Sequence, residues 1–154
     1  MHTYTTSIRI HASVESVFAF HTDPANLLRI TPRTIRVDIL RFDAAGEGAM
    51  VELRIRPLPL IFTRWLMRFD VFEPPYRLSD VQVRGPFRHW RQLREFIPDG
   101  DEYCLLRDTV EYALPFGIFG RILNRALVAR QIRGMFAYRQ EKTRETVESA
   151  ERRA

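Results

Sequence analysis

The sequence has 154 residues, of which 45% are hydrophobic and 28% charged, a size and composition that suit one domain with a buried core. The charged residues comprise 24 basic and 19 acidic side chains, a net charge of +5. This composition excludes a disordered chain, and the lack of an apolar run of about 18 residues excludes a membrane-spanning helix.

The N-terminal part of the chain predicts one strand followed by two short helices. Residues 3–11 are rich in β-branched side chains, which favour a strand. Ser13 has the chemistry of a helix N-cap, and an amphipathic stretch follows it. Asp23 and Pro24 form a second helix start, and Pro32 ends that helix.

A run of antiparallel strands is predicted between residue 34 and residue 114. Apolar and polar residues alternate there with a period of two, and proline and glycine separate the alternating segments. Asp99-Gly100 is a strong hairpin signal. The expected strands are residues 35–40, 50–56, 61–72, 78–84, 87–97 and 103–114.

One long helix is predicted over residues 118–147, because these residues contain no proline and follow a period of 3.6. Thirty residues of helix would be about 45 Å long, enough to cross the sheet. The expected inward stripe is Ile118, Ile122, Ala129, Ile132 and Phe136. Small residues on this helix favour open space over a filled groove, namely Ala126, Ala129, Gly134 and Ala137.

The element order predicts an α+β helix-grip fold: a curved antiparallel sheet wrapped round the long C-terminal helix, with two short N-terminal helices at one end. Residues 1–147 would form a single ligand-binding domain, and residues 148–154 would be a frayed tail. A pocket is expected, because a curved sheet and a straight helix cannot touch along their full length.

An ordered set of motifs supports this fold: Val17-Phe18-Ala19-Phe20-His21-Thr22-Asp23-Pro24, Phe72-Glu73-Pro74-Pro75, Arg84-Gly85-Pro86-Phe87 with Trp90, Asp108-Thr109-Val110-Glu111-Tyr112 with Pro115-Phe116-Gly117, and Met135-Phe136-Ala137-Tyr138-Arg139. The chain resembles the SRPBCC superfamily, which includes START and Bet v 1-like proteins and polyketide cyclase/dehydrases. It looks like a bacterial branch of ligand-binding members, similar in pattern to CoxG-like and cyclase/dehydrase-like proteins. The resemblance implies the helix-grip fold and a ligand cavity. Relatives in this branch often have a Trp-x-His-x-His-x-Phe strand, but residues 90–96 here contain neither histidine.

Candidate ligand-binding residues are those whose strand or helix face should line the interior: Trp65, Met67, Phe69, Trp90, Phe96, Asp108, Val110, Tyr112, Ala129, Ile132 and Phe136. Asp108 shares a strand face with apolar residues, so its carboxylate would lie in a dry interior. Three interpretations stay open: an ion pair with Arg91 or Arg139, a ligand-polarising or acid/base role, and simple exposure.

Other kinds of site lack support in the sequence. The four histidines have no metal-ligand spacing, so neither a metal nor a cofactor is expected. His21 ends a helix, and its expected role is a helix C-terminal cation, with a polar group at the pocket mouth as the alternative. Cys104, the one cysteine, has no activation signal and suits a cytoplasmic protein, as does the lack of a signal-peptide pattern. Arginines are spread through the chain without a nucleic-acid-binding motif.

The function hypotheses are therefore three. The first is binding or carrying, without catalysis, of a small hydrophobic molecule such as a lipid, isoprenoid, quinone or polyketide. The second is a cyclase or dehydratase that uses Asp108 with an arginine or Tyr112. The third is an adaptor for an anionic membrane or a protein partner, with Arg54, Arg56, Arg64 and Arg68 as its basic surface. The sequence leaves the ligand's identity and the oligomeric state open.

Overall fold

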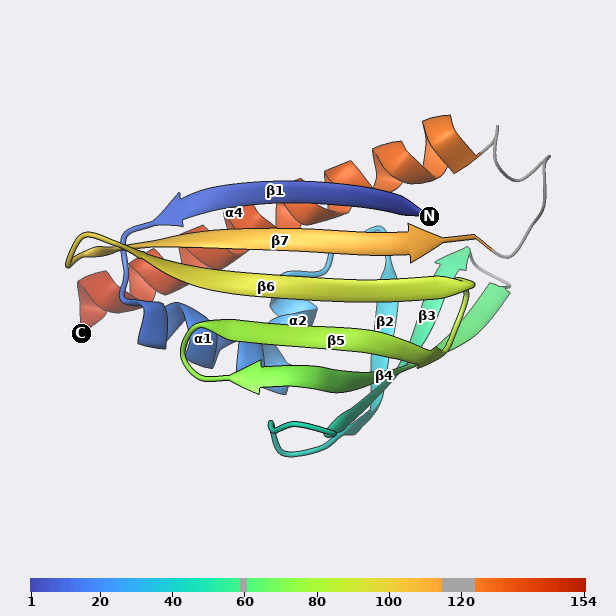
Figure 1. Cartoon of the computed structure of the whole chain (residues 1–154), viewed down its shortest axis with the longest axis horizontal. Coiled ribbons are helices and arrows are strands. Elements are labelled where there is room, and N and C mark those ends of the chain that lie inside the picture. Colours follow the sequence, from blue (N-terminus) through green and yellow to red (C-terminus); the bar gives the residue numbers. More distant parts are fainter. Residues whose placement is uncertain (59–60, 115–123) are drawn as a thin grey trace.

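Seven antiparallel strands form one curved sheet in a computed structural model that describes residues 1–58, 61–114 and 124–154 (Figure 1). The order across the sheet is β1-β7-β6-β5-β4-β3-β2, so the chain places its first strand beside its last. The strands are β1 (His2–Ile10), β2 (Arg36–Phe42), β3 (Met50–Leu58), β4 (Ile61–Glu73), β5 (Arg77–Arg84), β6 (His89–Asp99) and β7 (Tyr103–Ala113).

Two short helices, α1 (Val14–Thr22) and α2 (Pro24–Arg29), follow β1 and begin where the capping residues predict. The Ser13 hydroxyl accepts a hydrogen bond from the Ser16 amide at 3.1 Å, and the Asp23 carboxylate accepts one from the Ala25 amide at 2.9 Å. Asp23 is at once the C-cap of α1 and the N-cap of α2.

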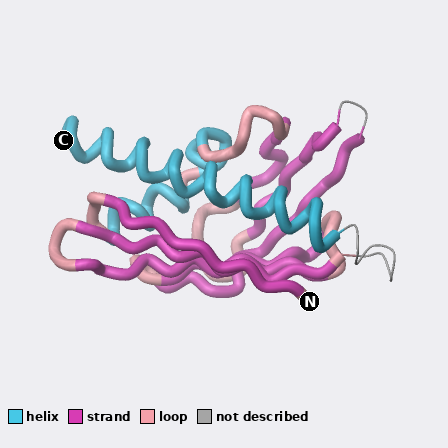
Figure 2. The backbone as a smooth tube through the Cα atoms, turned by 90° about the horizontal axis from the view of Figure 1, so that it is seen from above, coloured by secondary structure: helices cyan, strands magenta, loops and turns pink. Residues whose placement is uncertain are grey.

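The long C-terminal helix α4 (Ala129–Arg153) follows a π-helical turn, η1 (Asn124–Val128), and lies across the concave face of the sheet (Figures 1 and 2). Its buried stripe is Ile132, Phe136, Gln140, Thr143 and Val147, at steps of four, four, three and four residues. These elements confirm the predicted helix-grip fold. The predicted helical residues Ile118 and Ile122 lie outside the described residues.

The end of α4 continues to Arg153, through residues that the sequence predicts to fray. Two glutamates at this end are bound to the N-terminal part of the chain. Glu148 accepts a hydrogen bond from the His11 amide at 2.9 Å, and Glu151 accepts one from the Ser16 hydroxyl at 2.6 Å. These contacts give the last turns of the helix tertiary partners, which an isolated helix end lacks.

The small residues of the helix do not create space against the sheet, contrary to the expectation from the sequence. Ala126, Gly134 and Ala137 are exposed, and a Cβ added at Gly134 would meet no atom within 4 Å. The actual inward stripe is displaced from them and contains polar residues, which a hydrophobic-period search does not select.

Two apolar clusters form the core at opposite ends of the concave face. The first includes Phe18, Phe96, Leu106 and Val147, and the second joins Trp90, Val110, Tyr112, Ile132 and Phe136. Within the described helices, none is long and apolar enough to cross a membrane.

Candidate functional site

A band of buried polar side chains separates the two apolar clusters. On β7, Asp108 lies between Leu106 of the first cluster and Val110 of the second. Strand β6 has the same order, because Gln92 and Arg94 lie between the inward aromatic residues Trp90 and Phe96. Helix α4 contributes Gln140 and Thr143, which lie between apolar residues of its buried stripe. Buried polar groups are costly unless they are paired, so a band contributed by three elements is a candidate functional site.

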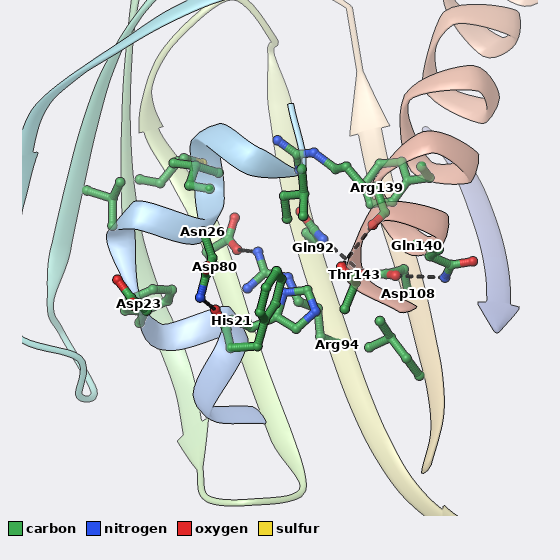
Figure 3. Close-up of a pocket in the computed structure, with 18 of the residues that line it drawn as sticks. His21, Asp23, Asn26, Asp80, Gln92, Arg94, Asp108, Arg139, Gln140 and Thr143 are labelled. Carbon is green, nitrogen blue, oxygen red and sulfur yellow. Dashed lines mark hydrogen bonds and ion pairs between the residues drawn. The ribbon is translucent and has the colours of Figure 1, made fainter. Parts of the chain in front are cut away.

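A cavity of about 60 Å³ opens along this band, between the sheet, the two short helices and α4 (Figure 3). This volume is room for a few water-sized groups. The exposed residues Asp23 and Arg68 are part of its lining, which places the mouth between α2 and β4. Its polar lining residues are His21, Asn26, Asp80, Gln92, Arg94, Asp108, Arg139, Gln140 and Thr143.

Asp80 and Arg94 form a buried ion pair in the cavity wall. Arg94 Nη2 donates to Asp80 Oδ1 at 2.5 Å, and Asp80 is 3% exposed. Burial raises the pKa of Asp80, although Arg94 and Arg139 act in the opposite direction. Asp80 Oδ2 is buried and has no hydrogen-bond partner among the described residues.

Asp108 is held by two amides. Gln92 Nε2 donates to Oδ1 at 3.0 Å, and Gln140 Nε2 donates to Oδ2 at 2.8 Å (Figure 3). Asp108 is 4% exposed, and burial raises its pKa, while the charge of Arg94 and the two amides lower it. Neither arginine proposed from the sequence is its direct partner, because Arg91 pairs with Asp70 at 2.9 Å and no carboxylate among the described residues lies within 4.0 Å of the Arg139 guanidinium.

Arg139 extends from α4 across the cavity (Figure 3). Its Nε is buried and has no hydrogen-bond partner in the described part of the chain. Burial, and then the positive charge of Arg94, lower the pKa of Arg139 to about 10, so the group is still a cation at neutral pH.

The His21 imidazole lines the cavity and is neutral, so the prediction of a helix C-terminal cation is wrong. Burial holds the pKa of His21 well below its ordinary value, and the positive charges of Arg94 and Arg139 add to this effect. Its ring packs against Phe96, with 5.5 Å between ring centroids. The alternative interpretation is a polar group at the pocket mouth; His21 does line the pocket, but it packs inside against Phe96.

The structure places only some of the predicted ligand-binding residues in the cavity lining. Met67, Phe69, Asp108 and Phe136 line the cavity. The second apolar cluster contains Trp90, Val110, Tyr112 and Ile132, and Trp65 packs against both clusters. Phe96 belongs to the first cluster, and Ala129 is half-buried at the start of α4.

Sequence reasoning missed Asp80, Gln92, Arg94, Gln140 and Thr143 as cavity residues. Gln92 and Arg94 occupy the two positions where the resemblance leads one to expect histidines, and both belong to the cavity lining. One signal could have found them. Alternate residues of a strand share a face, so Gln92 and Arg94 lie on the same inward face as Trp90 and Phe96.

Other candidate sites carry less chemistry. Burial raises the pKa of Cys104 to about 11, so its thiol is a poor nucleophile. Within the described ranges, no group of three His, Cys, Asp or Glu side chains is placed to hold a metal ion.

The basic surface predicted on β3 and β4 is partly neutralised. Arg54 lies within 3.0 Å of Asp38, and Arg64 lies within 3.7 Å of Glu52. Arg56 covers the ring of Phe62 at 4.3 Å. The local carboxylates reduce the charge that this surface presents to an anionic membrane.

Solved structures with the same fold come from several organisms. The protein TTHA0849 of Thermus thermophilus is 22% identical, with a TM-score of 0.75 over 97% of this chain and 99% of that one. The Zhui aromatase/cyclase of Streptomyces sp. R1128 is 16% identical, with a TM-score of 0.75 over 96% of this chain and 93% of that one. A START superfamily protein of Mycobacterium smegmatis is 15% identical, with a TM-score of 0.70 over 96% and 99% of the two chains.

At these identities the structural likeness establishes the fold alone. Among curated proteins, none has a sequence that matches this one significantly. The family model for polyketide cyclase/dehydrase and lipid transport proteins matches residues 1–148. The chain therefore belongs to the polyketide cyclase/dehydrase and lipid transport family, within the SRPBCC superfamily that its motifs resemble.

Proposed function

We propose that this protein binds a small, mainly hydrophobic molecule in the cavity between the sheet and α4 and does not transform it. The observation that carries this proposal is the mixed lining of the cavity. Apolar side chains from several elements line it together with a few polar groups, which is the composition of a site that binds and orients an amphipathic ligand. The apolar lining residues are Phe20, Leu27, Ile30, Phe42, Val51, Met67, Phe69, Leu106 and Phe136.

The size of the cavity limits the ligand. A volume of about 60 Å³ accepts a short chain or a small ring, and a larger molecule requires the walls to move. The short helix α2 contributes Asn26, Leu27 and, just beyond its end, Ile30 to the lining, and it has few residues of its own to resist such a movement.

Binding of a neutral naphthylamine dye, detected by the increase in its fluorescence in an apolar site, tests the proposal. Met67→Trp adds bulk to a lining side chain and should weaken dye binding by at least about tenfold. Met50→Trp is the matched control, because Met50 is half-buried and is not part of the lining. Equal binding by both variants would argue that the dye binds elsewhere. Native mass spectrometry of the protein from its own host would then identify a retained ligand.

A second candidate function is a cyclase or dehydratase reaction, which the convergence of ionisable groups on the cavity favours. Asp108 with a raised pKa is suited to donate or accept a proton, and the Arg139 cation is suited to stabilise an oxyanion. Tyr112, which the sequence offered as a partner, lies in the second apolar cluster instead of the cavity lining.

The fate of the retained ligand separates the two functions. In the binding function, wild type and Asp108→Asn return the ligand chemically unchanged after prolonged incubation. In the enzymatic function, wild type converts the ligand, and Asp108→Asn binds it but loses conversion by at least about a hundredfold. Mass spectrometry of the extracted ligand distinguishes these results.

A further inference from the structure

The charges around the cavity are not balanced pair by pair. Arg94 is engaged with Asp80, and both oxygens of Asp108 are engaged with glutamine amides. Arg139 is the remaining charged group of the band. In residues 1–58, 61–114 and 124–154, no carboxylate lies within 4.0 Å of its guanidinium, and its buried Nε lacks a hydrogen-bond partner.

Two arginines and two carboxylates of the cavity lining act on one another, but only one arginine has a direct carboxylate partner. Arg94 and Arg139 are the charged groups that lower the pKa of His21. The charge of Arg94 also lowers the pKa of Arg139, while Asp108 and Asp80 raise it without reaching ion-pair distance of the Arg139 guanidinium. A buried cation in this situation gains most from an anion that enters the cavity, because the anion replaces the water that burial has removed.

A cationic ligand fits the cavity less well than an anionic one. Asp80 Oδ2 is buried without a partner among the described residues, and it could accept a hydrogen bond from a ligand. A cationic ligand at this oxygen would have to share the carboxylate with Arg94 and would be repelled by Arg139. An anion placed on Arg139 disrupts no existing ion pair.

We propose that the cavity selects ligands that carry a carboxylate, which forms hydrogen bonds with the Arg139 guanidinium while the apolar part of the ligand lies against Leu27, Met67 and Phe69. The planar fork of a guanidinium matches the two oxygens of a carboxylate. This inference rests on the proposed function, since it specifies the class of ligand for the same cavity.

Matched pairs of small ligands test it. Hexanoate and hexanamide have nearly the same shape and differ in charge, and their dissociation constants are measured by titration calorimetry or by displacement of the neutral dye. Wild type should bind hexanoate at least about tenfold more tightly than hexanamide. Arg139→Gln should abolish this preference while retaining hexanamide binding, and Arg139→Lys should retain part of it. Arg133→Gln, at an exposed arginine of the same helix, is the control and should preserve the preference.

A measurement on wild type covers the case in which Arg139→Gln fails to fold. Hexanoate labelled with carbon-13 at its carboxyl group reports its own ionisation, and the pKa of the bound acid should be lower than that of the free acid. An unchanged pKa, or equal affinity for hexanoate and hexanamide, would overturn the inference while leaving the proposed function intact. Failure of hexanoate, hexanamide and the neutral dye all to bind would overturn the proposed function.

Discussion

Asp108 of β7 and Gln140 of α4 are joined by a hydrogen bond of 2.8 Å between the carboxylate Oδ2 and the amide Nε2. The same amide also donates to the Thr6 carbonyl at 3.2 Å, and its oxygen accepts from the Thr6 hydroxyl at 3.3 Å. Gln140 therefore ties the helix to two neighbouring strands, and it does so in the middle of the buried polar band.

Replacement of Gln140 by methionine should destabilise the protein by about 1–3 kcal/mol, because it leaves a buried carboxylate oxygen and a backbone carbonyl without their donor. Urea denaturation followed by tryptophan fluorescence measures the change. Gln131→Met, at an exposed position of the same helix, should change the free energy of unfolding by less than about 0.5 kcal/mol. Equal effects at the two positions would contradict the role given to the buried amide.

Asp108 should make stability depend on pH in an unusual direction. Because burial raises its pKa in the folded state, the folded protein holds this proton more tightly than the unfolded chain. Its contribution to stability is therefore full below the unfolded pKa and decreases as pH rises through the folded pKa. Asp108→Asn removes this pH-dependent contribution to the stability. The stability of the variant relative to wild type should improve between about pH 4 and pH 7, as measured by urea denaturation at several pH values. A constant difference across this range would show that the pKa of Asp108 is the same in the folded and unfolded states.

His21 should have the opposite effect. Its pKa is lowered by burial and by the two arginines, so the unfolded chain binds a proton more readily than the folded protein. The stability that this neutral imidazole contributes is full above the unfolded pKa, near about pH 6.5, and decreases as pH falls below it. Nitrogen-15 spectra of the imidazole should show one neutral tautomer at about pH 6. An equal population of imidazolium at this pH would contradict the prediction.

Two glycines should respond to alanine in opposite directions. Gly134 is exposed in α4 with no neighbour near an added Cβ, so Gly134→Ala should stabilise the protein by about 0.5–1 kcal/mol. At Gly85 an added Cβ would lie 2.5 Å from Trp65 Cδ1 and 2.5 Å from Gln82 Oε1. This oxygen already accepts a hydrogen bond from the Phe87 amide. Gly85→Ala should destabilise by about 1–3 kcal/mol. Thermal unfolding of both variants measures the difference, and a stable Gly85→Ala protein would show that the turn relaxes freely.

The order of strands and helices could be predicted from local signals. Period-two alternation, the Ser13 and Asp23 caps and the long run without proline each depend on residues close in the sequence. The inward parity of Asp108 could be predicted in the same way, since Leu106 and Val110 beside it are apolar and buried.

The partners of these residues could not be predicted, because they depend on how the strands and the helix meet. Asp108 pairs with glutamines 16 residues before it and 32 residues after it, and nothing local distinguishes those glutamines from exposed ones. A search for hydrophobic periodicity also does not select Gln140 and Thr143, because they are polar. Their burial becomes evident only from their contacts in the folded structure.

Asp23 ends one short helix and begins the next, and it also lies at the mouth of the cavity. Because the two helices meet at this one residue, a local opening there would loosen the end of α1 and the start of α2 together. The cavity would then lose one whole wall in a single local unfolding event, rather than widen by degrees.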